Sequence, residues 1–276
     1  MSELLSAEDY LRFPQQAGDI RYAYGPHPLQ FAELSLPTSA PPHPVVILIH
    51  GGCYRELYDL RPLSSVVTYL VGMGSAVWNI EYRRHGCGGN FPHMFLDAAA
   101  AVDYLRQIAV EHDLDLDRII SVGHSAGGHL ALWLAGRSRI PANNPLYSAD
   151  PLPNHAVLAL APLTDIASAW RRGACGEALL DVMGGSPDHA PANYRAGSPA
   201  QLLPLGLRQM ILVGEHDSDI LQEARQYTDA AAKYGDQAQL LVLPEAGHFE
   251  IVAVSSAAWR MVGSALQLLA AASASG

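Results

Sequence analysis

Basic residues are scarce in this chain of 276 residues, which carries 17 Lys and Arg against 27 Asp and Glu. The formal net charge is −10 at pH 7, and no run of Lys or Arg interrupts this acidic balance. A surface of this sign repels phosphate groups, so the composition argues against nucleic acid and anionic membranes as partners. A small molecule is therefore the expected ligand.

Cysteine is scarce as well. The three cysteines, Cys53, Cys87 and Cys175, lack the close spacing of a zinc motif, and their odd number argues against a disulfide framework. The 12 histidines form no His-Glu-x-x-His motif, and the cysteines form no Cys-x-x-Cys pair. We therefore expect neither a bound metal nor another cofactor in this protein.

Long apolar runs are also missing. No stretch approaches the ~20 uninterrupted apolar residues of a membrane span. Residues 1–10 contain acidic side chains and lack the apolar core of a secretory signal. These absences predict a cytoplasmic protein that does not enter a membrane.

What the chain does contain is a regular alternation of apolar, β-branched runs with helical patterns. The order and spacing predict buried strands and helices: strands at residues 45–49, 75–82, 116–122, 156–160, 208–213 and 239–243, and helices at residues 61–73, 94–112, 220–234 and 257–270. Residues 20–24 and 29–36, joined by the turn dipeptide Gly25-Pro26, predict an antiparallel hairpin at an edge. Such alternation is typical of a mostly parallel sheet with helices on both faces, and the length suits a single α/β domain over residues 1–276.

Residues 162–204 interrupt this pattern. They show no strand periodicity and contain several Gly and Pro residues. We expect short helices that form a small cap over a binding cleft, because long insertions of this kind commonly shape a site. Trp170 and Tyr194 are candidate substrate contacts within it, although packing inside the cap is the preferred explanation for both.

A Gly-His-Ser-Ala-Gly sequence at residues 123–127 lies between the strand at 119–122 and a helical pattern at 130–134. A Gly-x-Ser-x-Gly turn between strand and helix exposes the serine hydroxyl above the sheet. The glycines allow the strained backbone and the close packing of such a turn. Ser125 is therefore the predicted nucleophile.

A serine nucleophile needs a base and an acid. His248 follows the last predicted strand and can take the serine proton, while a carboxylate after a late strand orients the imidazole. Asp217, just past the strand at 208–213, is the preferred acid; Asp219 is the runner-up and Asp165 a weaker alternative. The order nucleophile, acid, base is that of the α/β-hydrolases.

The sequence His50-Gly51-Gly52-Cys53-Tyr54 directly follows the strand at 45–49. Glycines in this place leave backbone N–H groups free to hold the negative charge of a tetrahedral intermediate. The predicted oxyanion hole combines the N–H of Gly52 or Cys53 with that of Ala126. Neighbouring Tyr54 and His85 are further candidate substrate contacts.

Three other histidines have supporting roles in this interpretation. His50 is expected to hold the oxyanion loop through hydrogen bonds. His124 and His129 flank Ser125 in the sequence, and their side chains are expected to point away from it and to pack or hydrogen bond.

The chain resembles the kynurenine formamidase branch of the α/β-hydrolases over residues 45–252. The similar pieces are the segments at residues 50–54, 123–130, 215–218 and 248–252. The resemblance implies Ser125, Asp217 and His248 as the catalytic triad, and the hydrolysis of a small ester or an activated amide, such as an aryl formamide, through an acyl- or formyl-enzyme. The chain departs from the formamidases at Cys53-Tyr54, where they carry Tyr-Trp, and small bacterial esterases, including feruloyl-esterase-like hydrolases, look similar over the same pieces.

Two other functions stay open on the sequence. A catalytically silent α/β-hydrolase used as a binding module is expected to lose a triad member, and none is missing here. A short-peptide hydrolase of the oligopeptidase type is compatible with the same triad. The sequence also leaves open whether the protein is a monomer or a dimer.

Overall fold

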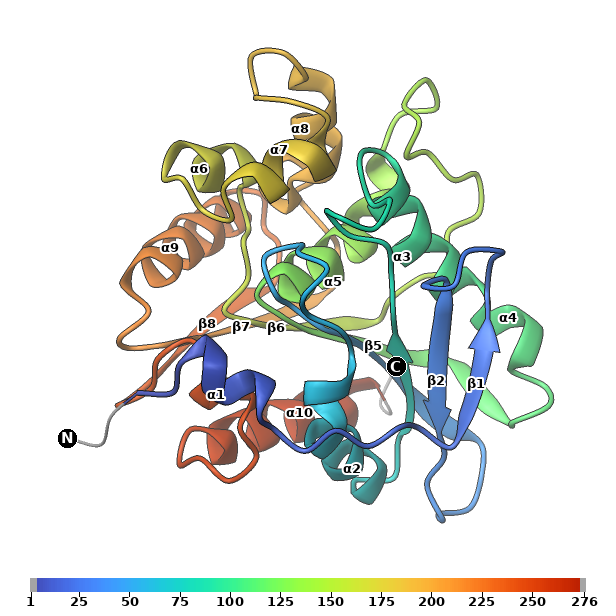
Figure 1. Cartoon of the computed structure of the whole chain (residues 1–276). Helices are drawn as coiled ribbons and strands as arrows, with labels where there is room; N and C mark the ends of the chain where they lie inside the picture. The colour runs from blue at the N-terminus through green and yellow to red at the C-terminus, as the bar shows by residue number, and fades with distance from the viewer. Residues whose placement is uncertain (1–3, 274–276) are drawn as a thin grey trace.

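The computed structural model describes residues 4–273, which form an eight-stranded sheet between two layers of helices (Figure 1). The strand order is β1-β2-β4-β3-β5-β6-β7-β8. The strands comprise β1 (Ile20–Ala23), β2 (Phe31–Ser35), β3 (His43–Ile49), β4 (Ala76–Ile80), β5 (Leu114–His124), β6 (Ala156–Leu160), β7 (Arg208–Gly214) and β8 (Ala238–Leu243). Strand β2 is antiparallel to both of its neighbours, and the strands from β4 to β8 are parallel. The predicted edge hairpin and the mostly parallel sheet are confirmed.

Helices cover both faces of the sheet, which is why every residue of β4 and β6 is buried. In Figure 1, helices α2 (Ser64–Gly72) and α10 (Trp259–Ser273) lie below the sheet. Helices α3 (His93–Asp103), α5 (Ala126–Gly136) and α9 (Ser218–Lys233) lie above it. None of the helices within residues 4–273 has the length and apolarity needed to cross a membrane.

The helix predicted at residues 94–112 is two helices in the structure. Helix α3 ends at Asp103, and α4 (Leu105–Ile108) follows after a single residue. Asp113 then adopts a left-handed φ of 49°, which turns the chain into β5 at Leu114. The strand therefore starts two residues earlier than its apolar pattern indicates.

Residues 162–204 contain three short helices, α6 (Ile166–Arg171), α7 (Glu177–Met183) and α8 (Pro191–Gly197), at the top of Figure 1. They are tied to the main body by polar contacts. The Phe91 N–H donates to the Asp181 carbonyl at 3.1 Å, and the Gly197 carbonyl accepts from the His129 ring at 2.7 Å. The segment between β6 and β7 thus packs on the same side of the sheet as α3 and α5.

Candidate active site

Ser125 lies between β5 and α5 in a strained backbone conformation, with φ 56° and ψ −119°. A left-handed φ is costly for a residue with a side chain and persists only where the surroundings enforce it. Here the Ser125 N–H donates to the Leu160 carbonyl at 2.8 Å, and its carbonyl accepts from the His129 N–H at 3.0 Å. The sheet on one side and the helix on the other therefore hold the turn.

The glycines around Ser125 are required by close backbone packing. A Cβ on Gly123 would lie 2.1 Å from the Gly127 carbonyl oxygen, and a Cβ on Gly127 would lie 2.1 Å from the Ile49 carbonyl oxygen. Neither neighbour is a flexible side chain that could give way. The end of β3, the end of β5 and the start of α5 therefore meet only because these positions lack side chains.

We expect Gly127→Ala to lower the free energy of unfolding by about 3 kcal/mol, the upper end of the usual cost of overpacking, because the added methyl overlaps fixed backbone atoms. Gly72→Ala is the matched control, since a Cβ at Gly72 meets nothing within 4 Å at the end of α2. It should be neutral or stabilise by up to about 1 kcal/mol through helix propensity. Urea unfolding of both variants measures the difference, and equal effects would contradict the packing argument.

Asp217 and His248 come together although 31 residues separate them. The His248 Nδ1–H donates to Asp217 Oδ2 at 2.5 Å, which leaves Nε2 free to accept a proton. Asp219 lies in the first turn of α9, and Asp165 is occupied as the N-cap of α6, where its Oδ1 accepts the Ser168 N–H at 3.0 Å. Of the three candidate acids, Asp217 is thus the one bonded to His248.

His124 supports the His248 loop from below, a contact that the sequence did not specify. Its Nε2–H donates to the His248 carbonyl at 2.9 Å, and the two ring centroids are 4.7 Å apart. Burial, with a smaller contribution from His248, lowers the pKa of His124 to about 3. A neutral His124 adds no positive charge beside His248.

The loop after β3 lies against Ser125. A Cβ on Gly51 would lie 3.0 Å from the Ser125 Cβ, so the loop and the predicted nucleophile are in contact. Gly52, Cys53 and Tyr54 have consecutive positive φ values of 109°, 51° and 57°. Two of these three residues carry side chains, so other contacts must maintain this unfavourable backbone.

One such contact is made by His50, at the start of the loop. Its Nδ1–H donates to the Gly51 carbonyl at 2.9 Å, while its own carbonyl accepts from the Tyr82 hydroxyl at 2.7 Å. Glu81 and Arg84 form a buried ion pair beside the ring. The His50 Nε2 lies 3.0 Å from Glu81 Oε1 and 3.3 Å from the Arg84 guanidinium, and burial together with the Arg84 charge lowers the pKa of His50 to about 3.

A second contact joins the loop to α5. Tyr54 is fully buried, and its hydroxyl donates to His129 Nδ1 at 2.9 Å. Burial lowers the pKa of His129 to about 4, in keeping with this acceptor role. Tyr54 was predicted to contact substrate, but the structure places it in the interior, where it supports the loop.

The other candidate substrate contacts are distributed around the 162–204 segment. Tyr194 is only 4% exposed and donates to the Gly185 carbonyl at 3.1 Å, so it packs within that segment. Trp170 is half-buried on α6. His85 lies 3.0 Å from Asp181 through its Nδ1 and lines a cavity of about 410 Å³ together with Arg55 and residues of α7.

The expectation of a chain without a disulfide framework needs correction. Cys53 and Cys175 are joined by a disulfide, with Cα atoms 5.0 Å apart, and Cys87 is a free thiol. An odd number of cysteines leaves one unpaired but does not exclude one bond. The pairing links the loop after β3 to the turn before α7.

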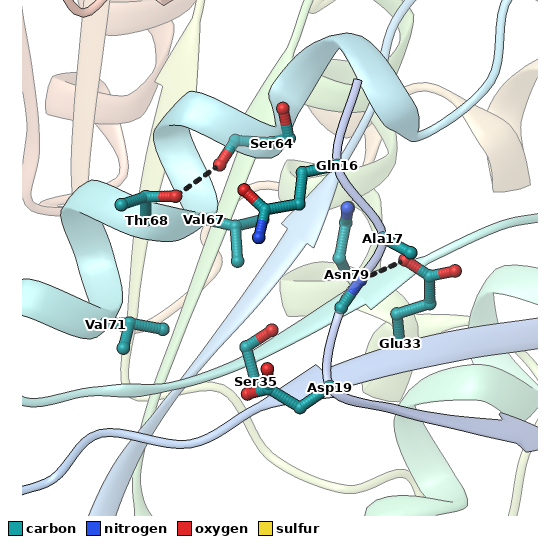
Figure 2. A pocket seen from close by; sticks show the side chains of 11 residues that line it. Gln16, Ala17, Asp19, Glu33, Ser35, Ser64, Val67, Thr68, Val71 and Asn79 are labelled. Atoms are coloured by element: carbon teal, nitrogen blue, oxygen red, sulfur yellow. Dashed lines mark hydrogen bonds between the residues drawn. The ribbon is translucent and has the colours of Figure 1, made fainter. Parts of the chain in front are cut away.

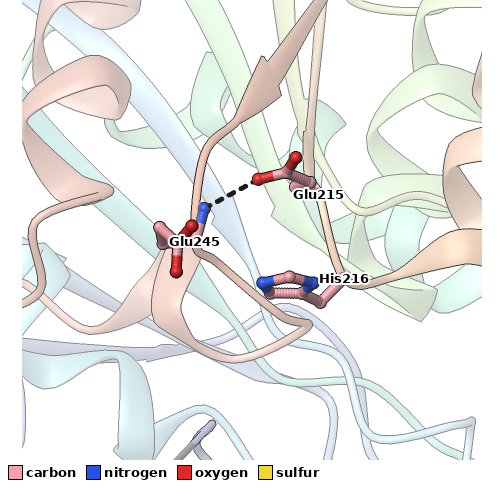
Figure 3. A group of neighbouring side chains, drawn as sticks. All are labelled: Glu215, His216 and Glu245. Carbon is pink, nitrogen blue, oxygen red and sulfur yellow. Dashed lines mark hydrogen bonds between the residues drawn. The ribbon is translucent and has the colours of Figure 1, made fainter. Parts of the chain in front are cut away.

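One cavity and one cluster of polar side chains include none of Ser125, Asp217 and His248. A cavity of about 140 Å³ lies between residues 16–19, β2 and α2, and Glu33 in its wall accepts the Gly18 N–H at 2.7 Å; Figure 2 shows the side chains that line it. Figure 3 shows Glu215, His216 and Glu245, whose possible ligand atoms lie within 4.8 Å of one another. All three residues are exposed, and Glu215 already accepts the Glu245 N–H at 3.1 Å, so the cluster alone does not define a metal centre.

The three buried, neutral histidines predict acid sensitivity. The folded-state pKa values of His50, His124 and His129 lie below the ordinary value of 6.5. As the pH falls below 6.5, the unfolded chain takes up protons that the folded chain does not, so the free energy of unfolding falls. At pH 5 the loss is about 2 kcal/mol per histidine, and no loss arises from them above pH 7.

Urea unfolding at pH 7.5 and pH 5 measures this effect. The midpoint should drop sharply at pH 5, and His129→Gln should reduce the drop by about a third. His216→Gln, at an exposed position, is the control and should leave the drop unchanged. Equal midpoints at the two pH values for the unaltered protein would contradict the prediction.

The parallel sheet, the helices on both faces and the order of Ser125, Asp217 and His248 define an α/β-hydrolase fold. Solved structures share it. Esterase B from Lactobacillus rhamnosis is 19% identical with a TM-score of 0.76, covering 96% of this chain and 90% of that one. A truncated carbohydrate esterase from gut microbiota is 17% identical with a TM-score of 0.77, covering 94% and 99%. A bifunctional GH43-CE protein of Bacteroides eggerthii is 22% identical with a TM-score of 0.68, and the match covers 84% of this chain and 36% of that one.

Within this class, the chain belongs to the BD-FAE family, whose pattern matches residues 33–226. The chain is also similar to esterase LipC of Mycobacterium tuberculosis, with 28% identity over 249 residues. That match covers 83% of this chain and 59% of the relative, so the chain spans less than two thirds of the curated relative's length.

Proposed function

We infer that this protein is a serine esterase that hydrolyses small carboxylic esters through Ser125, His248 and Asp217. The observation that carries the proposal is the 2.5 Å bond from the His248 ring to Asp217, in a fold where Ser125 occupies the strained turn after the central strand β5. Membership of the BD-FAE family and similarity to esterase LipC support the same chemistry.

The proposed reaction is ester hydrolysis through an acyl-enzyme, and each of its steps uses a named group of the site. His248 Nε2 takes the Ser125 proton as Oγ attacks the ester carbonyl, and Asp217 stabilises the imidazolium that forms. The oxyanion is held by the Ala126 N–H, at the start of α5, and by the N–H of Gly52 or Cys53. The imidazolium then protonates the leaving alcohol, and water activated by His248 hydrolyses the acyl-enzyme.

An activated amide, such as an aryl formamide, is the alternative substrate for the same site, because its hydrolysis through a formyl-enzyme needs the same catalytic groups.

The test measures hydrolysis of p-nitrophenyl acetate and butyrate, methyl ferulate and N-formylkynurenine by the purified protein. A fluorophosphonate-inhibited sample is the blank. Ester turnover that the inhibitor abolishes is expected. Turnover of N-formylkynurenine far above the esters would shift the assignment to a formamidase, and no inhibitor-sensitive turnover of any substrate would reject the hydrolase.

A further inference from the structure

The Cys53–Cys175 disulfide connects two turns that are far apart in the sequence and that both lie outside the strands and helices. Cys53 belongs to the loop after β3, and Cys175 lies 122 residues later, in the turn between α6 and α7. Both residues adopt a left-handed φ, of 51° and 60°. The bond therefore cross-links two strained turns, one of which supplies the proposed oxyanion hole.

This position makes the bond relevant to catalysis. The directions of the Gly52 and Cys53 N–H groups depend on the three consecutive positive φ values of the loop. Other bonds also restrain this part of the loop: the Arg55 N–H donates to the Gly52 carbonyl at 3.0 Å, the His85 N–H donates to the Tyr54 carbonyl at 2.8 Å, and the Tyr54 hydroxyl bonds to His129. Loss of the bond removes the restraint nearest to the oxyanion donors.

The bond is also placed for thiol exchange. Cys53 is half-buried and is the more exposed of the two, whereas Cys175 is 8% exposed. The cavity of about 410 Å³ is lined by Arg55 and Glu177, each of which follows one of the two cysteines by two residues in the sequence. The Arg55 Nη2 lies 3.9 Å from the position of a Cβ on Gly176, so its cation is close to the Cys175 turn and can stabilise a departing thiolate.

We propose that the Cys53–Cys175 disulfide is a reversible redox site that keeps the oxyanion loop in its catalytic conformation and that its reduction lowers esterase turnover. A thiolate of a dithiol reductant attacks the Cys53 sulfur, which breaks the S–S bond and releases the Cys175 thiolate. The second reductant thiol then displaces Cys53, so two electrons and two protons pass to the cysteines and the reductant becomes a cyclic disulfide. The functional part of this proposal rests on the esterase assignment.

The expected loss of kcat on reduction is about tenfold. This is smaller than the 10²- to 10³-fold cost of removing an oxyanion donor outright, because Tyr54 and His50 continue to hold the loop. KM should change less than kcat, since the bond acts on the donors of the transition state. Reoxidation should restore the original rate.

The experiment compares the unaltered protein, Cys175→Ser and Cys87→Ser, each with and without dithiothreitol, at a temperature where all are folded. Alkylation with iodoacetamide, followed by mass measurement, counts the free thiols. The unaltered protein and Cys87→Ser should gain two thiols and lose kcat together on reduction. Cys175→Ser should have the reduced rate from the start and not respond to dithiothreitol.

Three outcomes overturn the proposal: three free thiols before reduction, an unchanged kcat after two thiols appear, or a reductant response in Cys175→Ser. Hydrogen exchange separates this test from that of the esterase itself. Faster exchange at residues 51–58 on reduction is expected whether or not esters are the substrate. If no ester is turned over but this exchange changes, the esterase assignment fails while the redox control of the loop stands.

Discussion

Ser125→Ala is expected to lower kcat for p-nitrophenyl esters by a factor on the order of 10⁶. Without the hydroxyl no acyl-enzyme can form, and His248 and Asp217 lose the group that they activate. Removing the serine of a triad costs about as much as removing all three members, because the three act as one unit. The residual rate above that of water should come from the oxyanion hole and from binding alone.

The loss must be separated from misfolding. Ser125 is held through its backbone N–H and carbonyl, and both bonds remain in the alanine variant. We therefore expect an unchanged thermal unfolding midpoint. Ser264→Ala, at an exposed position on α10, is the matched control and should keep full activity. Retention of a tenth or more of the activity by a folded Ser125→Ala protein would rule out Ser125 as the nucleophile.

The scaffold could be predicted because its signals are local. Continuous apolar runs such as residues 45–49 mark strands that are buried on both faces, and β3, β4, β6 and β7 are such strands in the structure, whereas β8 at the edge is only partly buried. The turn at Ser125 was recognisable because glycines on either side of a serine, between an apolar strand and a helix, have a steric cause. In the structure, a Cβ on either Gly123 or Gly127 would lie 2.1 Å from a backbone carbonyl oxygen, which is this steric cause.

Contacts between distant residues could not be predicted in the same way. The partner of Cys53 is 122 residues away, and the hydroxyl of Tyr54 bonds to a histidine 75 residues later. Nothing in the local pattern distinguishes a tyrosine that faces a substrate from one that anchors a loop. Composition was equally uninformative, since three cysteines allow one bond as readily as none.

The choice between Asp217 and Asp219 was open for a related reason. Both residues stand at the start of α9, two positions apart, and both fit the order of an α/β-hydrolase triad. Only the direction of the side chain differs. In the structure the carboxylate of Asp217 accepts the His248 Nδ1–H, which fixes the tautomer whose Nε2 can take the Ser125 proton.

Asp217→Asn is therefore expected to lower kcat by about 10⁴-fold. The amide is uncharged and cannot stabilise the imidazolium, and its NH₂ group can donate to Nδ1 and so favour the tautomer that carries its proton on Nε2. That tautomer cannot accept the Ser125 proton. KM should change little, because Asp217 acts on His248 and not on the bound substrate.

Asp219→Asn is the matched control for this prediction. It makes the same chemical change two residues away, in the first turn of the same helix, and should alter kcat by no more than a few-fold. Steady-state kinetics of both variants on one p-nitrophenyl ester, with circular dichroism to verify folding, decide between the two acids. A large loss of kcat in Asp219→Asn with a small one in Asp217→Asn would reverse the assignment. The carboxylate whose removal costs the most activity is the one that stabilises the His248 imidazolium in the transition state.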